Sequence, residues 1–257
     1  MLQTAERVSH TDLSDNYVFK RSILAYVEAA KLVSGKVLEI GTGSGYGIDV
    51  VSPGVTEFVT IDKFEDPAVI AHIATLPNVT FKRIDVPPLT GLDDNTFDFV
   101  ITFQVIEHIE NDLRFVQEIH RVLKPGGKLI VTTPNIKMSL TRNPWHVREY
   151  TISELDVLLK KSFASVMKKG VSGNQKIMDY YLKNKASVEK ITRFDIFNLQ
   201  YRLPRQLLQI PYDILNRMNR RKLLKSNTSL VSDIQMEDYR VQEVTDECFD
   251  LFYLATK

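Results

Sequence analysis

The sequence predicts an α/β fold in which a mostly parallel sheet is covered by helices on both faces. Short apolar runs alternate with amphipathic segments of helical period along residues 17–171, which is typical of strand-helix-strand units. The first run, 36–40, is apolar and closed by glycines, as expected for a strand that is buried on both faces. The glycine-rich turn after it lies where such sheets bind ligands.

Each predicted element follows from its local pattern. Strands are expected where short runs rich in apolar residues are bounded by turn residues, at residues 36–40, 57–61, 79–84, 97–103, 128–133, 163–171 and 248–255. Helices are expected where apolar residues recur at helical spacing, at residues 17–33, from near Gly45, and at about 68–75, 111–123 and 151–159, with Thr151 or Ser153 as the cap of the last. The breakers at 124–127 predict a turn before the fifth strand.

Residues 172–245 are predicted to form a mostly helical insertion before the last strand. Helical patterns lie near 177–182 and 205–218, with Pro204 and Pro211 expected to interrupt them. The segment 216–225 has no acidic residue and carries a basic cluster, Arg217, Arg220, Arg221, Lys222 and Lys225. This cluster is interpreted first as a solvated helix face, and alternatively as a surface for an anionic substrate, a membrane or nucleic acid.

The composition excludes several broad classes of protein. The 257 residues include 33 Lys and Arg against 32 Asp and Glu, so no global field attracts nucleic acid or anionic membranes. The single cysteine, Cys248, excludes an intramolecular disulfide and a cysteine-rich zinc site, and favours a reducing compartment. The first residues do not show the pattern of a signal peptide, and no run of eighteen uncharged apolar residues is found. We therefore expect a cytoplasmic protein without a membrane span.

The glycine-rich segment 41–47, Gly-Thr-Gly-Ser-Gly-Tyr-Gly, is the strongest local signal of a binding site. Glycines allow positive φ and let main-chain amides approach a ligand. Tyr46 occupies the position of the third glycine of the dinucleotide fingerprint, which disfavours NAD. No Lys followed by Ser or Thr comes after Gly47, which disfavours a nucleoside triphosphate. A ligand without a pyrophosphate is favoured.

Residues 39–45, Glu-Ile-Gly-Thr-Gly-Ser-Gly, resemble motif I of class I S-adenosylmethionine-dependent methyltransferases. Four later positions agree in order: Asp62 after the second strand, Asp85 after the third, 97–109 at the fourth strand, and 123–127 before the fifth. The resemblance covers about 33–171 and the last strand. It implies a Rossmann-like sheet of seven strands with the last one antiparallel, and S-adenosylmethionine as cofactor.

The resemblance also assigns roles to individual residues. Asp62 resembles the acid that binds the ribose hydroxyls, and Asp85 the acid that receives the adenine amino group, with the Val86 amide at the ring. Glu39 is expected either near the amino group of the cofactor's methionine part or bonded to loop amides. The full set of implied cofactor-binding residues is Glu39, Gly41, Thr42, Gly43, Gly45, Asp62, Lys63, Asp85, Val86, Gln104 and Val105.

Two histidines are the candidate catalytic residues. Methyl transfer from a sulfonium is an in-line displacement that needs alignment, exclusion of water and, for a hydroxyl acceptor, removal of a proton. His108 follows the fourth strand beside Glu107, and is either a base or a local hydrogen-bonding residue. His146 lies in a loop expected to border the acceptor pocket. No metal is predicted, because Glu107, His108 and His146 do not show the spacing of three or four clear ligands.

The residues around the predicted pocket limit the chemical classes of acceptor. Trp145 and Tyr150 are candidates for an aromatic wall and Arg148 for an anionic acceptor, although packing explains them equally well. The segment 102–105, Thr-Phe-Gln-Val, lacks the Asn/Asp-Pro-Pro-aromatic signature of enzymes that methylate amide-type nitrogen. Cytosine carbon methylation needs a cysteine nucleophile, and Cys248 is expected far from the pocket.

The sequence thus predicts a methyltransferase that acts on a small-molecule acceptor, with oxygen as the favoured atom and a sugar or quinone-like molecule as candidates. It divides the chain into an N-terminal lid or helix at 1–33, which includes His10 and Tyr17, a cofactor-binding domain at 34–171 plus 246–257, and the insertion at 172–245. One alternative is an RNA methyltransferase that uses the basic cluster. Another is a non-catalytic cofactor-binding protein whose insertion serves oligomer or partner contacts, and a homo-oligomer stays open.

Overall fold

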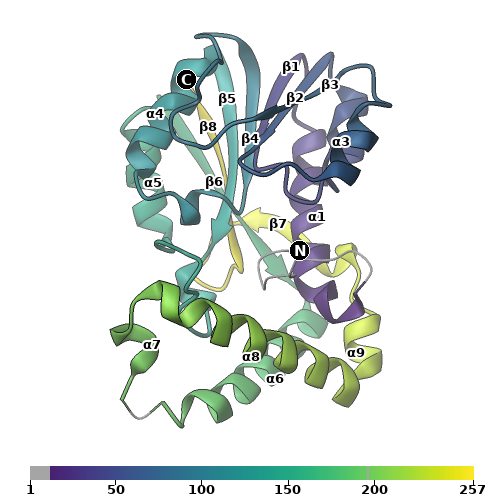
Figure 1. Cartoon of the computed structure of the whole chain (residues 1–257), viewed down its shortest axis with the longest axis vertical. Helices are drawn as coiled ribbons and strands as arrows, with labels where there is room; N and C mark the ends of the chain where they lie inside the picture. Colours follow the sequence, from purple (N-terminus) through teal and green to yellow (C-terminus); the bar gives the residue numbers. More distant parts are fainter. Residues whose placement is uncertain (1–11, 196) are drawn as a thin grey trace.

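A computed structural model describes residues 12–195 and 197–257, with one mixed sheet and helices on both of its faces (Figure 1). The eight strands lie in the order β3-β2-β1-β4-β5-β8-β6-β7. Strands β1 to β5 pair in parallel, and β8 is antiparallel to both of its neighbours, β5 and β6. The predicted α/β class and the antiparallel last strand are confirmed.

The strand bounds agree closely with the predicted ones. They are β1 Lys36–Ile40, β2 Glu57–Asp62, β3 Val79–Arg83, β4 Phe97–Phe103, β5 Leu123–Pro134, β6 Ser165–Gly173, β7 Tyr239–Glu243 and β8 Asp250–Thr256. The predicted turn at 124–127 is instead an irregularity inside β5, where the pairing with β4 shifts register and Gly126 has a φ of +76°. Strand β7 was not predicted, and it lies within the range assigned to the insertion.

Seven helices of the described residues follow predicted segments, and two of these extend beyond them. The helices are α1 Asn16–Ala30, α2 Ile48–Val51, α3 Pro67–Ile73, α4 Asp112–Val122, α5 Ile152–Lys160, α6 Gln175–Thr192, α7 Leu199–Arg202, α8 Arg205–Ser226 and α9 Thr228–Ser232. Helices α6 and α8 extend beyond their predicted segments, and the short helices α7 and α9 do not correspond to a predicted helical segment. Short 3-10 turns are η1 Leu13–Asp15, η2 Ser52–Gly54, η3 Ile106–His108, η4 Ile136–Met138 and η5 Met236–Asp238. Thr151 caps α5 in a capping box with Glu154. Pro211 was expected to interrupt a helix, but α8 continues through it.

Alternate residues of the strands build a core on each face of the sheet. On one face, Leu38 and Leu129 pack with α4 and α5, for example against Phe115. On the other face, Val37 and Ile130 pack with α1, α2 and α3. Because successive side chains of a strand point to opposite faces, burial of both sets requires the continuous apolar runs that the sequence shows.

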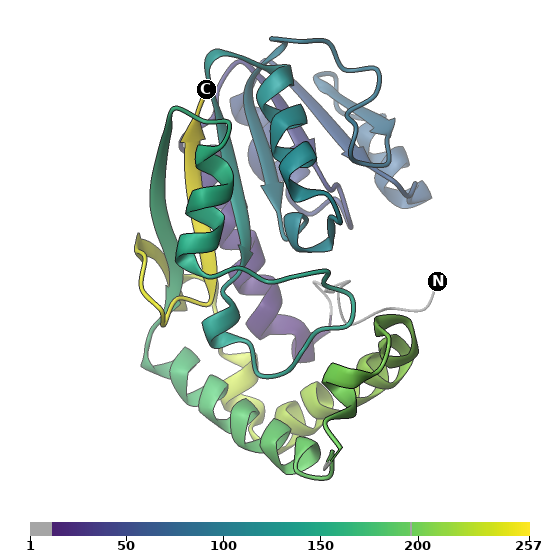
Figure 2. The same cartoon turned by 90° about the vertical axis from the view of Figure 1, so that its left-hand side faces the viewer.

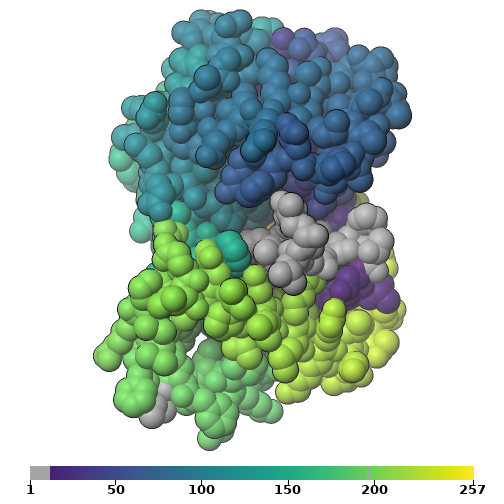
Figure 3. All heavy atoms as spheres, viewed as in Figure 1, coloured from purple at the N-terminus to yellow at the C-terminus, as the bar shows by residue number. Residues whose placement is uncertain are grey.

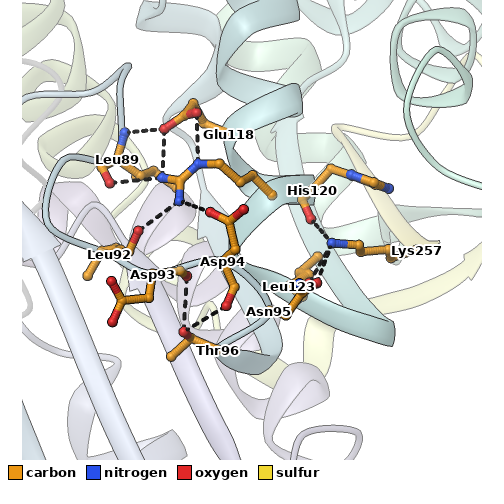
Figure 4. Close-up of polar contacts among 11 residues, drawn as sticks. Leu89, Leu92, Asp93, Asp94, Asn95, Thr96, Glu118, His120, Leu123 and Lys257 are labelled. Carbon is orange, nitrogen blue, oxygen red and sulfur yellow. Dashed lines mark hydrogen bonds and ion pairs between the residues drawn. The ribbon is translucent and has the colours of Figure 1, made fainter.

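A polar network around Arg121 fixes the segment between β3 and β4 on the outside of α4 (Figure 4). The Arg121 guanidinium donates to both oxygens of Glu118, to Asp94, and to the carbonyl oxygens of Leu92 and Leu89. Nearby, the side-chain amine of Lys257 donates to main-chain carbonyls at the end of α4. These contacts tie the chain that enters β4 to a helix of the core.

The helices α6 to α9 lie together below the sheet, beyond its carboxyl edge, where α8 crosses the front of this part (Figures 1 and 3). The fully buried carboxylate of Asp15 anchors α8, because it pairs with Arg217 at 3.0 Å and with Arg220 at 2.8 Å. Two members of the basic cluster therefore point inward, and Arg221, Lys222 and Lys225 are exposed.

The predicted N-terminal lid is only partly within the described residues. His10 lies outside them, and Tyr17 belongs to α1, where its ring stacks on Tyr180 of α6 with 4.3 Å between centroids. The Tyr239 hydroxyl donates to the Tyr17 carbonyl oxygen, so α1 is joined to both α6 and β7. Among the helices of residues 12–195 and 197–257, none has the length and apolar composition that crossing a bilayer requires.

Candidate active site

The predicted site residues lie at or after the carboxyl ends of the parallel strands, the edge of the sheet that faces helices α6 to α9 in Figure 2. Strands β1, β2, β4 and β5 end at this edge, and each is followed by a candidate residue or loop. Ligands bind at this edge in open α/β sheets because the loops there converge. The fold therefore brings the glycine-rich loop, Asp62 and the segment after β4 close together.

The glycine-rich loop is held by main-chain hydrogen bonds to β2. Gly41 N and Thr42 N donate to Ile61 O at 2.8 and 3.1 Å. Gly41 has a φ of +96°, and a Cβ built there would lie 2.5 Å from Val105 Cγ2. Gly43 also has a positive φ, but nothing lies within 4 Å of its hypothetical Cβ. Glycine at 41 thus allows close packing, and glycine at 43 leaves the main chain open to a ligand.

Asp62 connects the end of β2 to this loop. Its Oδ2 accepts a hydrogen bond from Gly43 N at 2.9 Å, and its Oδ1 accepts one from Phe64 N at 3.0 Å. Each carboxylate oxygen retains acceptor capacity after one such bond. The neighbouring Lys63 is exposed, with its amine 5.2 Å from the centroid of the Phe64 ring. Asp62 is therefore a fixed acid that can accept bonds from the hydroxyls of a nucleoside.

Glu39 is a buried acid beneath the loop, only 2% exposed. Its Oε2 accepts a hydrogen bond from Thr60 Oγ1, which also lies 2.6 Å from Thr42 Oγ1. Among the described residues, Oε1 has no hydrogen-bond partner. The carboxyl bonds to a side chain rather than to loop amides, and burial raises its pKa to about 7.

The pKa of Glu39 predicts that stability falls as pH rises from about 4.5 to 7. The unfolded chain releases the proton first, so the folded state loses about 3 kcal/mol across this window and no more above it. We expect Glu39→Gln to gain stability relative to the wild type between pH 5 and pH 8, measured by urea unfolding of the ligand-free protein. Exposed Glu65 supplies the control, Glu65→Gln. If the unfolding free energies of Glu39→Gln and the wild type differ by the same amount at pH 5 and at pH 8, the prediction is contradicted.

The other predicted cofactor residues follow β3 and β4. Asp85 is exposed and Val86 is half-buried, just beyond the end of β3. Gln104 follows β4 with a φ of +57°, and its side-chain amide donates to Thr132 Oγ1 at 3.2 Å. A left-handed conformation in a residue other than glycine is costly and persists where the surroundings enforce it, often at functional sites. This backbone feature has no signal in the sequence.

The loop at 143–150 places His146 beside His108 and Glu107. Val147 N and Arg148 N donate to the carbonyl oxygen of Glu107, at 2.7 and 3.3 Å. The two imidazole rings meet edge to face with 5.0 Å between centroids. The structure thus joins the two candidate catalytic residues. Although the spacing of Glu107, His108 and His146 in the sequence does not indicate a ligand set, one ligand atom from each lies within 4.8 Å of the others.

Three further loop residues serve packing rather than a pocket. Trp145 Nε1 donates to Asp213 Oδ1 at 3.0 Å. The Tyr150 hydroxyl donates to Asp112 at 3.0 Å, and Arg148 forms an ion pair with the same carboxylate. The interpretation of Trp145 and Tyr150 as an aromatic wall, and of Arg148 as an anion-binding residue, is replaced by these contacts.

A cavity of about 560 Å³ lies between the sheet edge and helices α6 to α8. His146 lines it, and most of the other lining side chains are aromatic or aliphatic. Sequence analysis had not assigned many of the lining residues to a site, among them Arg21, Met138, Tyr180, Phe194, Leu215 and Phe249. Helix α1 borders both parts of the site, because Tyr17 lines the cavity and Tyr26 contacts Tyr46 of the glycine loop, with 5.4 Å between ring centroids.

The site residues fit a nucleoside cofactor that lacks a pyrophosphate. Gly43 offers open main chain, Asp62 offers a fixed carboxylate, and Glu39 offers a buried oxygen without a partner among the described residues. A cationic cofactor with ribose hydroxyls and an amino group matches this set of one open loop and two acids.

Comparison with known proteins agrees with this fit. A probable S-adenosylmethionine-dependent methyltransferase of Mycolicibacterium smegmatis is 38% identical over 164 residues, which cover 61% of this chain and 63% of that protein. A ubiquinone biosynthesis O-methyltransferase of Pseudomonas aeruginosa is 28% identical over 120 residues, covering 46% and 49%. The chain thus spans less than two thirds of the length of these curated relatives.

A solved structure shows the same fold. A methyltransferase of Thermotoga maritima, described as a possible histamine N-methyltransferase, aligns with a TM-score of 0.56 and 19% identity over 94% of this chain and 92% of its own. Residues 14–168 match the family described as a methyltransferase domain, which includes the glycine loop, Asp62 and the Glu107-His108 pair. The chain therefore belongs to the S-adenosylmethionine-dependent methyltransferase family.

Proposed function

We propose that the protein transfers the methyl group of S-adenosylmethionine to an oxygen atom of a small molecule bound in the cavity. The observation that carries this proposal is the position of the cavity, which lies at the same sheet edge as the glycine loop and is lined by His146. The name of the Pseudomonas aeruginosa relative, a ubiquinone biosynthesis O-methyltransferase, supports oxygen as the acceptor atom. The aromatic and aliphatic lining supports an acceptor with an apolar or aromatic body.

The bound cofactor would supply an activated methyl group on a sulfonium. Gly43, Asp62 and Glu39 would hold it, and the loop after β4 would border it. The side chains of α6 and α8 would orient the acceptor and exclude water, which is the main requirement of an in-line displacement. The acceptor hydroxyl would lose its proton at the end of the cavity where His146, His108 and Glu107 meet.

Substitution of His146 tests the proposed site. The His146 ring donates from Nδ1 to Glu149 at 2.7 Å and is 8% exposed, so His146→Gln removes an oriented imidazole from the cavity wall. We expect kcat to fall on the order of 100-fold, because a positioned group that accepts a proton contributes about 10²- to 10⁴-fold. The measurement is transfer of label from methyl-labelled S-adenosylmethionine to small molecules of a cell extract, and then to the purified acceptor.

Two comparisons make this test specific. His72→Gln removes an exposed imidazole that pairs with Asp49, and it should leave the rate unchanged. The affinity of His146→Gln for S-adenosylhomocysteine and its thermal unfolding should match the wild type, which separates a catalytic role from a folding role. Label that appears only in RNA or protein, or a wild-type chain that transfers none, would contradict the proposed function.

A further inference from the structure

The side chains of Glu107, His108 and His146 bring one carboxylate and two imidazoles to a single point beside the cavity. One ligand atom from each residue lies within 4.8 Å of the other two. Two imidazoles with one carboxylate form a donor set that binds Zn²⁺ and other divalent transition metals while leaving coordination positions open. Each imidazole can bind a cation only through a ring nitrogen that carries no proton.

The hydrogen-bond partners fix the proton positions of both rings. His108 Nδ1 lies 3.0 Å from the carbonyl oxygen of Trp145, and a carbonyl only accepts, so this nitrogen carries the proton. His146 Nδ1 lies 2.7 Å from a carboxylate oxygen of Glu149, which likewise accepts. In the neutral form of each ring, Nε2 then bears the lone pair. Histidine ligands of metals are oriented in this way, through a second ring nitrogen that donates to a carbonyl or carboxylate.

The third donor, Glu107, is fully buried and only partly satisfied. Its Oε2 accepts a hydrogen bond from Thr133 Oγ1 at 2.9 Å, and its Oε1 has no hydrogen-bond partner in the described part of the chain. A buried carboxyl oxygen without a partner costs free energy, and a bound cation would remove that cost. The main chain already fixes this geometry, since Glu107 O accepts hydrogen bonds from Val147 N and Arg148 N.

We propose that Glu107, His108 and His146 bind one divalent transition-metal cation, such as Zn²⁺ or Mn²⁺, at the end of the cavity that His146 lines. The side-chain amide of Asn143 lies 2.9 Å from His146 Nε2 and donates to its lone pair. A cation competes with this hydrogen bond, so binding requires the Asn143 amide to turn away.

The cation would act on the acceptor through its open coordination positions, and this step rests on the proposed function. With the cation bound, His146 serves as its ligand and does not accept the proton. A hydroxyl oxygen bound to a divalent cation has a lowered pKa and loses its proton to water. The bond from this oxygen to the methyl carbon then forms while the bond from carbon to sulfur breaks, which leaves the methylated acceptor and S-adenosylhomocysteine. The cation keeps its oxidation state throughout. Acceptors with a second oxygen next to the hydroxyl would bind best, because they chelate the cation.

Metal titration of the full chain tests the site without any methyl transfer. Protein freed of metal with a chelator is titrated with Zn²⁺ in a calorimeter and with Co²⁺ in an absorption spectrometer. We expect one cation per chain and a visible Co²⁺ absorption band. Glu107→Gln and His108→Gln should each weaken the affinity about 100-fold or more, and Glu149→Gln about 10-fold through loss of ring orientation. His72→Gln, at an exposed imidazole, should bind like the wild type.

Two results would overturn the proposal. The first is no binding of Zn²⁺ or Co²⁺ by the wild type up to about 1 mM. The second is equal binding by the wild type, Glu107→Gln and His108→Gln, which would assign the cation to another place on the surface. X-ray absorption of the Zn²⁺-loaded wild type needs no variant to fold, and a spectrum without two imidazole ligands would also reject the site. Failure of methyl transfer alone leaves these binding results standing and rejects only the proposed function.

Discussion

Asp15→Ala is expected to lower the free energy of unfolding by about 3–5 kcal/mol, because it removes the buried carboxylate that pairs with two arginines of α8. The Asp15 carboxylate is fully buried and accepts hydrogen bonds from Arg217 and Arg220. Both arginines belong to α8, so loss of Asp15 also loosens the wall of the cavity. Urea unfolding measures the change, and a lower affinity for the acceptor should accompany it.

Two variants show whether loss of the ion pairs causes the fall in stability. Asp179→Ala removes an exposed acid of α6 and should change stability by no more than about 0.5 kcal/mol. The triple variant Asp15→Leu, Arg217→Met, Arg220→Met removes all three charges and should be more stable than Asp15→Ala, since apolar residues replace buried ion pairs well. If the triple variant is no more stable than Asp15→Ala, the loss comes from packing rather than from unpaired charge.

The elements that the sequence predicted best are the central strands, which are buried on both faces of the sheet. The strands β1 and β4 have the predicted bounds 36–40 and 97–103, because a central strand buried on both faces is mostly apolar along its length. Within the described residues, strand β7 at the sheet edge pairs with β6 alone. Its alternation of Tyr239 and Val241 with polar residues extends over five positions, which is a weak strand signal. The local sequence therefore determines the central strands of the core, whereas the strand at the sheet edge depends on pairing with a neighbouring strand.

The same contrast holds in the site. The glycine loop, Asp62 and Gln104 directly follow strands, so their meeting at one sheet edge could be predicted from the order of elements, and their contacts with the cofactor remain predictions. The cavity could not be predicted, because Arg21, Tyr180 and Phe249 come from α1, α6 and the segment before β8. The cluster of Glu107 with His146 depends on main-chain hydrogen bonds between distant loops, for which residue spacing gives no signal.

Asp62→Asn is expected to weaken S-adenosylhomocysteine binding about 1000-fold while the fold is kept. The carboxylate already accepts hydrogen bonds from Gly43 N and Phe64 N, which hold it at the loop with acceptor capacity left for two ribose hydroxyls. A hydrogen bond to a charged group contributes about 2 kcal/mol, so loss of two such bonds amounts to about 4 kcal/mol, or about three powers of ten in affinity. Asparagine keeps the size of the side chain and one of the two acceptor oxygens that the loop uses, so either Gly43 N or Phe64 N loses its acceptor. Calorimetric titration with S-adenosylhomocysteine measures the effect.

The control for this variant must remove an acid near the loop that does not face the ligand. Asp49 meets this need, since it is exposed on α2, just after the glycine loop, and pairs with His72. Asp49→Asn should keep the affinity of the wild type, which excludes a general effect of charge on a cationic or zwitterionic ligand. Because a ligand that binds only the folded state raises the unfolding temperature, the same comparison can be made by thermal unfolding, where Asp62→Asn should lose the shift that the wild type and Asp49→Asn show. If Asp62→Asn instead binds within about 3-fold of the wild type, the acid at the end of β2 only holds the loop, and the ribose must be bound elsewhere.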